Sequence, residues 1–278
     1  MEAPRTAEAE ADAQMARASP ETARERIESV SKGDQFLPLA GYVAVLQRDG
    51  MTELSRERIV GWYEEMGAAL GLGDHLLDLA TNFLDRAVSA RSVTADEFRQ
   101  DAVAALYVAS KLEGTAAFKA TDVPVLTRGK ITNIIAAEAD LVRTLGWRTR
   151  APTVAHAVHD AIAFHGVDDF EAAEALAFSR VARTSYELVG VPPSLTAAAC
   201  VVAASSDARK VAEAASALDT PWSGSPSRVQ GCAALLRAAR AKQDAARLAR
   251  VPVESATTTS GAHVVQPIAT TSPKRPEL

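Results

Sequence analysis

Two stretches of small apolar residues constrain the fold of this chain more than any other feature. The first reads AVAALYVAS over residues 102–110, and the second reads SLTAAACVVAAS over residues 194–205. A helix that is apolar nearly all round has to be buried, so each stretch predicts a central helix packed among others. Because the two stretches resemble each other, the chain is predicted to hold two small helical domains in tandem.

The apolar periodicity on either side of these stretches is also helical, so the predicted fold class is all-α. We expect an N-terminal helical domain over residues 34–150 and a second over residues 151–246, divided by the segment Arg150-Ala151-Pro152-Thr153. Residues 1–33 and the Thr/Ser/Pro-rich residues 247–278 are predicted to be disordered tails. The expected helices cover residues 36–47, 54–70, 74–90, 94–113, 128–145, 153–165, 169–190, 193–209 and 226–246.

Residues with special backbone preferences mark several helix ends. Gly71 is expected to end the second helix, because glycine tolerates the left-handed conformation common at helix C-termini. Thr94 and Glu97 form the spacing of a capping box at the start of the fourth. Pro226 suits the first position of the last helix, with Ser225 as its N-cap.

Composition excludes several classes of function. The net charge of −5 does not favour a nucleic-acid partner, and no apolar run is long enough to span a membrane. Cys200 and Cys232 lie in apolar helical sequence and are interpreted as reduced core residues. There is no phosphate-binding glycine loop and no catalytic constellation, so we expect neither enzymatic activity nor a cofactor.

Histidines in the second domain raise the alternative of a metal site. The candidate ligands gather in one predicted helix and comprise His156, His159, Asp160 and His165. The first three share a helix face, but no further ligand group accompanies them. We therefore interpret them as ordinary histidines and expect no metal.

Four motifs in the first domain resemble, in order and spacing, those of the cyclin family. The segment RERIVGWYEEMGAALGLGDHLLDLATNFLDR at residues 56–86 resembles the opening of a cyclin box. ASKLEG at 109–114 resembles the Ala-Ser-Lys-x-Glu signature, EADLVRTLGW at 138–147 resembles a later helix of the box, and Ala-Pro-Thr at 151–153 resembles the segment after that helix. The resemblance implies tandem cyclin-box domains. It is strong over residues 52–155, weaker over 155–245 and absent from the tails.

The resemblance implies an ion pair between Arg56 and Asp85. In the family, the matching residues join the first two helices of the box. Removing one partner of a buried pair leaves an uncompensated charge, so such a pair is structurally important. Without the motif, two exposed charges on separate helices would be the expected interpretation.

The resemblance further implies that Lys111 and Glu138 bind the main chain of a kinase beside its helix C. A lysine donates to carbonyls and a glutamate accepts from amides, which suits this task. The alternative is that both are solvated helix charges. Glu113 and Phe118 belong to the same predicted kinase-binding surface, while Gly114 stands where the family usually has an acidic residue.

Two features concern substrates of the implied kinase. Many cyclins carry an apolar docking cleft for Arg-x-Leu motifs, and the matching positions here are Ser55, Arg58, Ile59 and Trp62. Only the last two are apolar, so we expect a degenerate patch with reduced docking. Ser272, followed by Pro-Lys-Arg, resembles a phosphorylation site of cyclin-dependent kinases; the alternative is a chance dipeptide.

The function implied by the resemblance is that of a cyclin, a non-catalytic subunit that binds and activates a cyclin-dependent Ser/Thr kinase in cell-cycle control. Its expected location is the nucleus and cytoplasm. Two rival functions remain. One is a transcription factor with two cyclin-like repeats, which the acidic charge and missing zinc ribbon disfavour. The other is a cyclin-fold scaffold that activates no kinase.

Overall fold

A computed structural model describes residues 34–48, 51–114, 118–127, 129, 131, 133–165, 167–205 and 226–250. Within these ranges all regular elements are helical, which confirms the all-α prediction. The elements are η1 Asp34–Phe36, α3 Tyr42–Leu46, α4 Glu53–Leu70, α5 Asp74–Ala90, α6 Ala95–Leu112, η2 Ala120–Asp122, α7 Val123–Leu126, α8 Ile134–Thr144, α9 Val154–His165, α10 Asp169–Thr184, η3 Tyr186–Leu188, α11 Pro193–Ala204 and α13 Pro226–Arg250.

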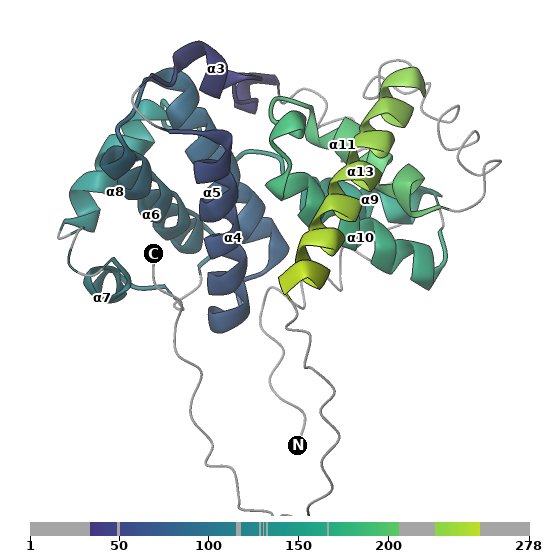
Figure 1. Cartoon of the computed structure of the whole chain (residues 1–278). Helices are drawn as coiled ribbons and strands as arrows, with labels where there is room; N and C mark the ends of the chain where they lie inside the picture. The colour runs from purple at the N-terminus through teal and green to yellow at the C-terminus, as the bar shows by residue number, and fades with distance from the viewer. Residues whose placement is uncertain are drawn as a thin grey trace, which may run out of the picture.

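The helices gather in two groups, α3–α8 and α9–α13 (Figure 1). Each group has its own cluster of buried apolar side chains. The two alanine-rich stretches lie at their centres. Residues 102–110 of α6 are buried throughout, as are residues 194–203 of α11. The domain limits proposed from the sequence remain a prediction, with residues 148–153 forming a helix-free link between the groups.

Several predicted helix ends are found in the structure. Thr94 accepts the Glu97 amide while the Glu97 carboxylate accepts from the Thr94 backbone, so the capping box forms. Gly71 follows α4 with a φ of 68°, the left-handed conformation expected there. Helix α13 begins at Pro226, while its proposed cap Ser225 lies outside the described residues.

Other helices are shorter than the periodicity predicted. The helix expected over 36–47 covers only Tyr42–Leu46, because Gly41 before it has a left-handed φ of 69°. The helix expected from 128 begins at Ile134, where Asn133 caps it by accepting the Ala136 amide. The helix expected over 169–190 ends at Thr184, because Ser185 is extended.

Helices α4 and α5 approach each other closely at Gly67. A Cβ at this position would lie 2.7 Å from Cδ1 of Leu77, nearer than two carbon atoms can pack. A larger residue at position 67 would therefore require the Leu77 side chain to shift.

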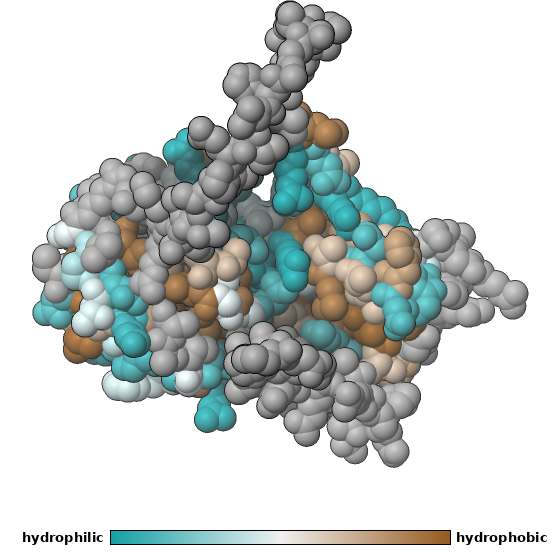
Figure 2. All heavy atoms as spheres, turned by 90° about the horizontal axis from the view of Figure 1, so that it is seen from below, coloured by the Kyte–Doolittle hydropathy of each residue, from teal (hydrophilic) through white to brown (hydrophobic). Residues whose placement is uncertain are grey.

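The polar junction between the two groups is visible on the surface. Seen from below, hydrophilic side chains separate apolar patches of the two groups (Figure 2). Among the described residues, none of the helices has the length and apolarity needed to cross a membrane. The predicted phosphorylation site, Ser272, lies outside the described residues.

Candidate functional site

Arg56 and Asp85 form a buried, two-pronged ion pair between α4 and α5. Nε of Arg56 donates to Oδ1 of Asp85 at 2.8 Å, and Nη2 donates to Oδ2 at 2.8 Å. The hydroxyl of Tyr42 also donates to Oδ1, at 2.9 Å. A guanidinium and a carboxylate paired in this way satisfy each other's planar geometry. The structure thus contains the ion pair that the sequence motif implied, in a buried setting.

The same guanidinium binds the other helical group. Arg56 donates to the carbonyl of Thr184 through Nη1 and to that of Arg183 through Nη2, both at 3.1 Å. These carbonyls lie at the C-terminal end of α10, where helix carbonyls lack intrahelical donors and a positive charge is favoured. Arg56 therefore joins the two groups as well as α4 and α5.

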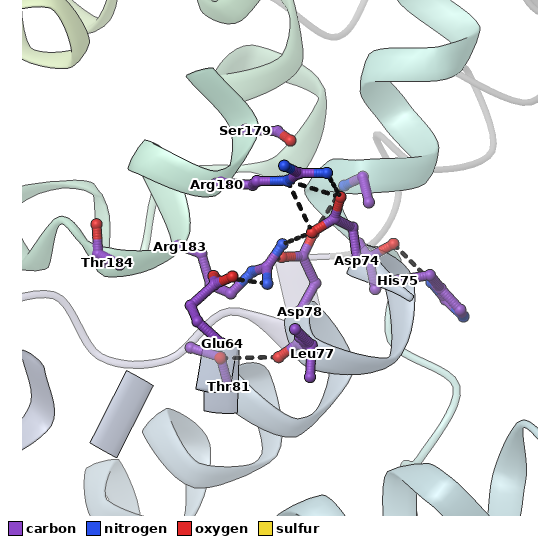
Figure 3. Close-up of polar contacts among 12 residues, drawn as sticks. Glu64, Asp74, His75, Leu77, Asp78, Thr81, Ser179, Arg180, Arg183 and Thr184 are labelled. Atoms are coloured by element: carbon purple, nitrogen blue, oxygen red, sulfur yellow. Dashed lines mark hydrogen bonds and ion pairs between the residues drawn. The ribbon is translucent and has the colours of Figure 1, made fainter. Parts of the chain in front are cut away.

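A second arginine makes the reciprocal connection, from α10 into the first group. Arg183 donates to Asp78 at 2.6 Å, to Asp74 at 2.6 Å and to Glu64 at 2.8 Å. Its side chain is 1% exposed. Arg180, one turn earlier in α10, also binds Asp74 but lies on the outside (Figure 3). Three carboxylates from α4 and α5 thus surround one buried guanidinium.

The protonation equilibria of these carboxylates differ. Burial alone would raise the pKa of Asp74, but Arg183 and Arg180 more than offset it and hold the pKa below its usual range. Burial raises the pKa of Asp78, and Arg183 and the Ala155 amide offset this only in part. Burial likewise raises the pKa of Glu64. Burial thus opposes the ionisation of all three carboxylates, and Arg183 offsets this cost, together with Arg180 at Asp74 and only in part at Asp78 and Glu64.

Arg183 and its carboxylates were not among the residues predicted from the sequence. A signal was available in α5, because Asp78 falls between apolar residues in the run Leu-Leu-Asp-Leu-Ala. An acidic residue on a buried face requires a partner. The partner itself could not be found, since Arg183 lies 105 residues further along the chain.

The predicted kinase-binding residues Lys111 and Glu138 meet on the surface between α6 and α8. Nζ of Lys111 donates to Oε1 of Glu138 at 2.5 Å, and lies 5.4 Å from the ring centre of Tyr107. The hydrogen bond to Glu138 raises the pKa of Lys111. Half of the Lys111 side chain is exposed. The Glu138 side chain is only 19% exposed, so the lysine is the more accessible member of this oriented pair.

The two neighbouring residues of this predicted surface play different parts. Phe118 is only 3% exposed, and its ring packs edge-on against Tyr107, so it supports the surface from beneath and does not present a contact. The predicted part of Phe118 in kinase binding stays a prediction. Glu113 is partly exposed and accepts from Nε2 of His75 at 3.1 Å. That hydrogen bond lowers the pKa of Glu113.

His75 continues this contact into the second group. Its Nδ1 lies 2.8 Å from the hydroxyl of Thr153, and its ring stacks on His156 with centroids 3.6 Å apart. Because a carboxylate only accepts, Nε2 of His75 carries the proton shared with Glu113. The C-terminal end of α6 is thus tied to the start of α9.

The candidate metal residues do not assemble into a site in the described part of the chain. No group of three or more His, Cys, Asp or Glu side chains is arranged to hold a metal ion there. His156 instead stacks on His75, and Asp160 is buried in the second group.

The four docking-patch residues all lie on α4, with different exposure. Ser55 takes part in the N-terminal capping box with Thr52, and Arg58 is exposed. Ile59 and Trp62 are buried in the core of the first group. The Nε1 donor of Trp62 has no acceptor among the described residues. The burial of Trp62 fits its predicted role as a packing residue. The reduced docking of Arg-x-Leu motifs at this patch stays a prediction.

Comparisons with known proteins show a similarity to cyclins. Residues 27–150 match the model of the cyclin N-terminal domain. Cyclin-A3-2 of Arabidopsis thaliana is 28% identical over 119 residues, 42% of this chain and 32% of that protein. Putative cyclin-F3-2 of Oryza sativa subsp. japonica is 31% identical over 101 residues, 36% of this chain and 25% of that protein. Residues 27–150 are thus similar to the N-terminal domain of cyclins, and the matches span a quarter to a third of these two relatives.

Solved structures extend the likeness of fold beyond this domain. A viral cyclin from herpesvirus saimiri superposes with a TM-score of 0.62 at 16% identity, covering 77% of this chain and 97% of the viral one. A chain of the CAK complex from Chaetomium thermophilum gives 0.50 at 17% identity, covering 84% and 75%. At these identities, the similarity concerns the fold alone.

Arg183→Ala is expected to destabilise the protein by about 3–5 kcal/mol, because it leaves buried carboxylates without their cation. Urea unfolding followed by circular dichroism measures the loss. The deficit should shrink as the pH falls, since Glu64 and Asp78 then bind protons more readily in the folded state than in the unfolded chain.

Arg180→Ala is the matched control for this substitution. Arg180 lies on the same helix as Arg183 and binds the same carboxylate, Asp74, but its guanidinium is exposed. Its cost should stay below about 1 kcal/mol. Equal losses for the two variants would contradict a special role for the buried arginine.

Arg56→Ala and Asp85→Ala should each cost about 3 kcal/mol, and the double variant should cost much less than their sum. The reason is that either single change leaves the other charge buried and unpaired. A double-mutant cycle in urea measures the coupling, and small additive losses would argue against it.

Proposed function

We propose that this chain is the regulatory subunit of a cyclin-dependent Ser/Thr protein kinase, which it binds and activates without catalysing a reaction itself. The observation that carries the proposal is the oriented pair Lys111–Glu138, with a half-exposed lysine, in a segment that matches the cyclin N-terminal domain. In the family, the matching residues bind the kinase main chain beside helix C. A donor and an acceptor already held together would lose little side-chain entropy on binding.

Exposed apolar side chains near the pair support a protein-binding surface. Leu112 follows Lys111 at the end of α6, and Ile135 lies one turn before Glu138 in α8; both are exposed. Trp147, after α8, is 76% exposed and has a left-handed φ of 61°. Exposed apolar residues on the helices that carry a charged pair, such as Leu112 and Ile135 here, resemble the anchors and polar contacts of protein interfaces.

The proposed activation mechanism depends on contact between this surface and helix C of the kinase. Binding of α6 and α8 to helix C would favour the inward position of that helix. A kinase glutamate could then pair with the ATP-binding lysine, and the activation loop would leave the active site. The subunit selects the active state through its greater affinity for it, so activation is a population shift.

Two alternative functions give different experimental outcomes. A promoter-binding factor would shift duplex DNA in a mobility assay with a strong dependence on salt. A scaffold would bind a kinase without raising its activity. Co-purification with candidate kinases, followed by a phosphorylation assay, separates the three.

Lys111→Ala and Glu138→Ala are expected to abolish kinase activation while leaving the helical fold intact. Each should cost about 2–4 kcal/mol of binding, because each removes one partner of a charge-assisted contact that loses water in the complex. Phosphorylation assays at increasing subunit concentration measure this, and circular dichroism checks the fold. Asp96→Ala, which removes an exposed ion pair at the other end of α6, is the control. Wild-type activation by the double variant would refute the assignment.

Substrates with and without an Arg-x-Leu motif are expected to be phosphorylated with similar kcat/KM. Arg58 replaces an apolar wall of the docking cleft and repels the arginine of the motif. The test compares two peptides that differ only in this motif. A preference above about tenfold, or roughly 1.4 kcal/mol, that disappears in Trp62→Ala would show that the cleft works.

A further inference from the structure

The last helix, α13, packs only one of its sides against the protein. Val229, Ala233 and Leu236 are buried against the second group. Arg237 donates to the carbonyls of Val202 and Ala203 at the end of α11, and Arg240 pairs with Glu174 of α10. These contacts hold the helix firmly across the outside of α9–α11 (Figure 1).

The outward side of α13 presents apolar side chains to solvent. Leu235 is 45% exposed and Leu248 is 75% exposed. The positions between them at steps of three and four, Ala238, Ala241 and Ala245, are also exposed. At 1.5 Å per residue, this surface is roughly 20 Å long. We call residues 235–248 of this side the outer face.

The final part of the helix extends beyond the core. Every position from 244 to 249 is exposed, so these residues have no buried contact with either group. A helical end draws most of its stability in proteins from packing. A firmly held helix with an uncovered apolar end is therefore suited to receive a partner.

The charge of α13 is opposite to that of the whole protein. The helix carries six basic residues and one acidic residue, a net charge of +5, whereas the chain has a net charge of −5. Its acidic residue, Asp244, faces Arg240. Arg228, Lys242 and Arg247 are exposed.

We propose that the outer face of α13 docks an acidic amphipathic helix of a partner protein. The leucines and alanines would pack against the apolar side of that helix, because small residues let two helices approach closely. Lys242 and Arg247 would face acidic residues on its flanks and speed the encounter. This proposal is independent of kinase activation, since α13 belongs to the other helical group.

Other occupants fit the outer face less well. A second copy would bring two helices of net charge +5 together, and like charges repel. A membrane surface requires large apolar side chains, whereas most here are alanines. Nucleic acid would use the basic residues alone and leave the leucines uncovered.

The test measures binding of the full chain to a fluorescent helical peptide of about 20 residues, with leucines on one side and glutamates on its flanks. Lys242→Glu with Arg247→Glu, and separately Leu235→Ser with Leu248→Ser, should each weaken binding at least about tenfold, or 1.4 kcal/mol. All four side chains are exposed, so circular dichroism should not change. Arg48→Glu with Lys119→Glu makes the same charge change elsewhere and should bind like the wild type.

Three results would overturn the proposal. The first is equal binding of a peptide with the same composition in scrambled order, which would show attraction by charge alone. The second is no binding of the peptide below about 1 mM. The third is that the α13 variants bind the peptide as the wild type does but no longer bind duplex DNA, anionic vesicles or a second copy of the chain.

Discussion

The burial of two arginines among carboxylates between α4, α5 and α10 is the constraint on which the arrangement of the molecule depends. A buried charge without a partner costs several kcal/mol, so each of these side chains restricts where the others can lie. Arg56 extends from α4 in the first group and binds the C-terminal end of α10. Arg183 extends from α10 and binds carboxylates of α4 and α5. Because the contacts run in both directions, the two helical groups are held in one relative orientation.

This junction also positions the surface proposed to bind a kinase. Each helical group has its own buried apolar core, with α6 at the centre of the first and α11 at the centre of the second. Glu113 at the end of α6 contacts His75 of α5, which stacks on His156 of α9. The end of α6 that carries Lys111 is therefore supported from two directions. A rigid support keeps the charged pair oriented before a partner arrives, which lowers the entropy lost on binding.

The two halves of the chain carry different kinds of information. The first half holds the cyclin motifs and matches the family model, and its exposed charges and apolar residues lie beside each other on α6 and α8. The second half resembles known proteins in fold alone, and its outer helix has a charge of its own. The two proposed binding surfaces therefore lie on different helical groups, one on α6 and α8 and the other on α13.

Much of this structure could be predicted from local sequence. The alanine-rich stretches determined the two central helices, because an entirely apolar helix has to be buried. The Thr94–Glu97 spacing and Gly71 determined helix ends through the local conformations they favour. The cyclin motifs pointed to Arg56 with Asp85 and to Lys111 with Glu138, and in the structure each pair is in direct contact.

Features that depend on contacts between distant segments could be found only in the folded chain. Nothing near Arg183 in the sequence shows that three carboxylates from α4 and α5 surround it, because pairing over more than one hundred residues leaves no local periodicity. The burial of Phe118 and the pairing of Glu113 with His75 depend likewise on how helices pack. Sequence determined which helices form and which are buried. How α4, α5 and α10 are joined depends on the burial of their arginines and carboxylates, which must pair once they lose water. Burial of this kind exists only in the folded chain.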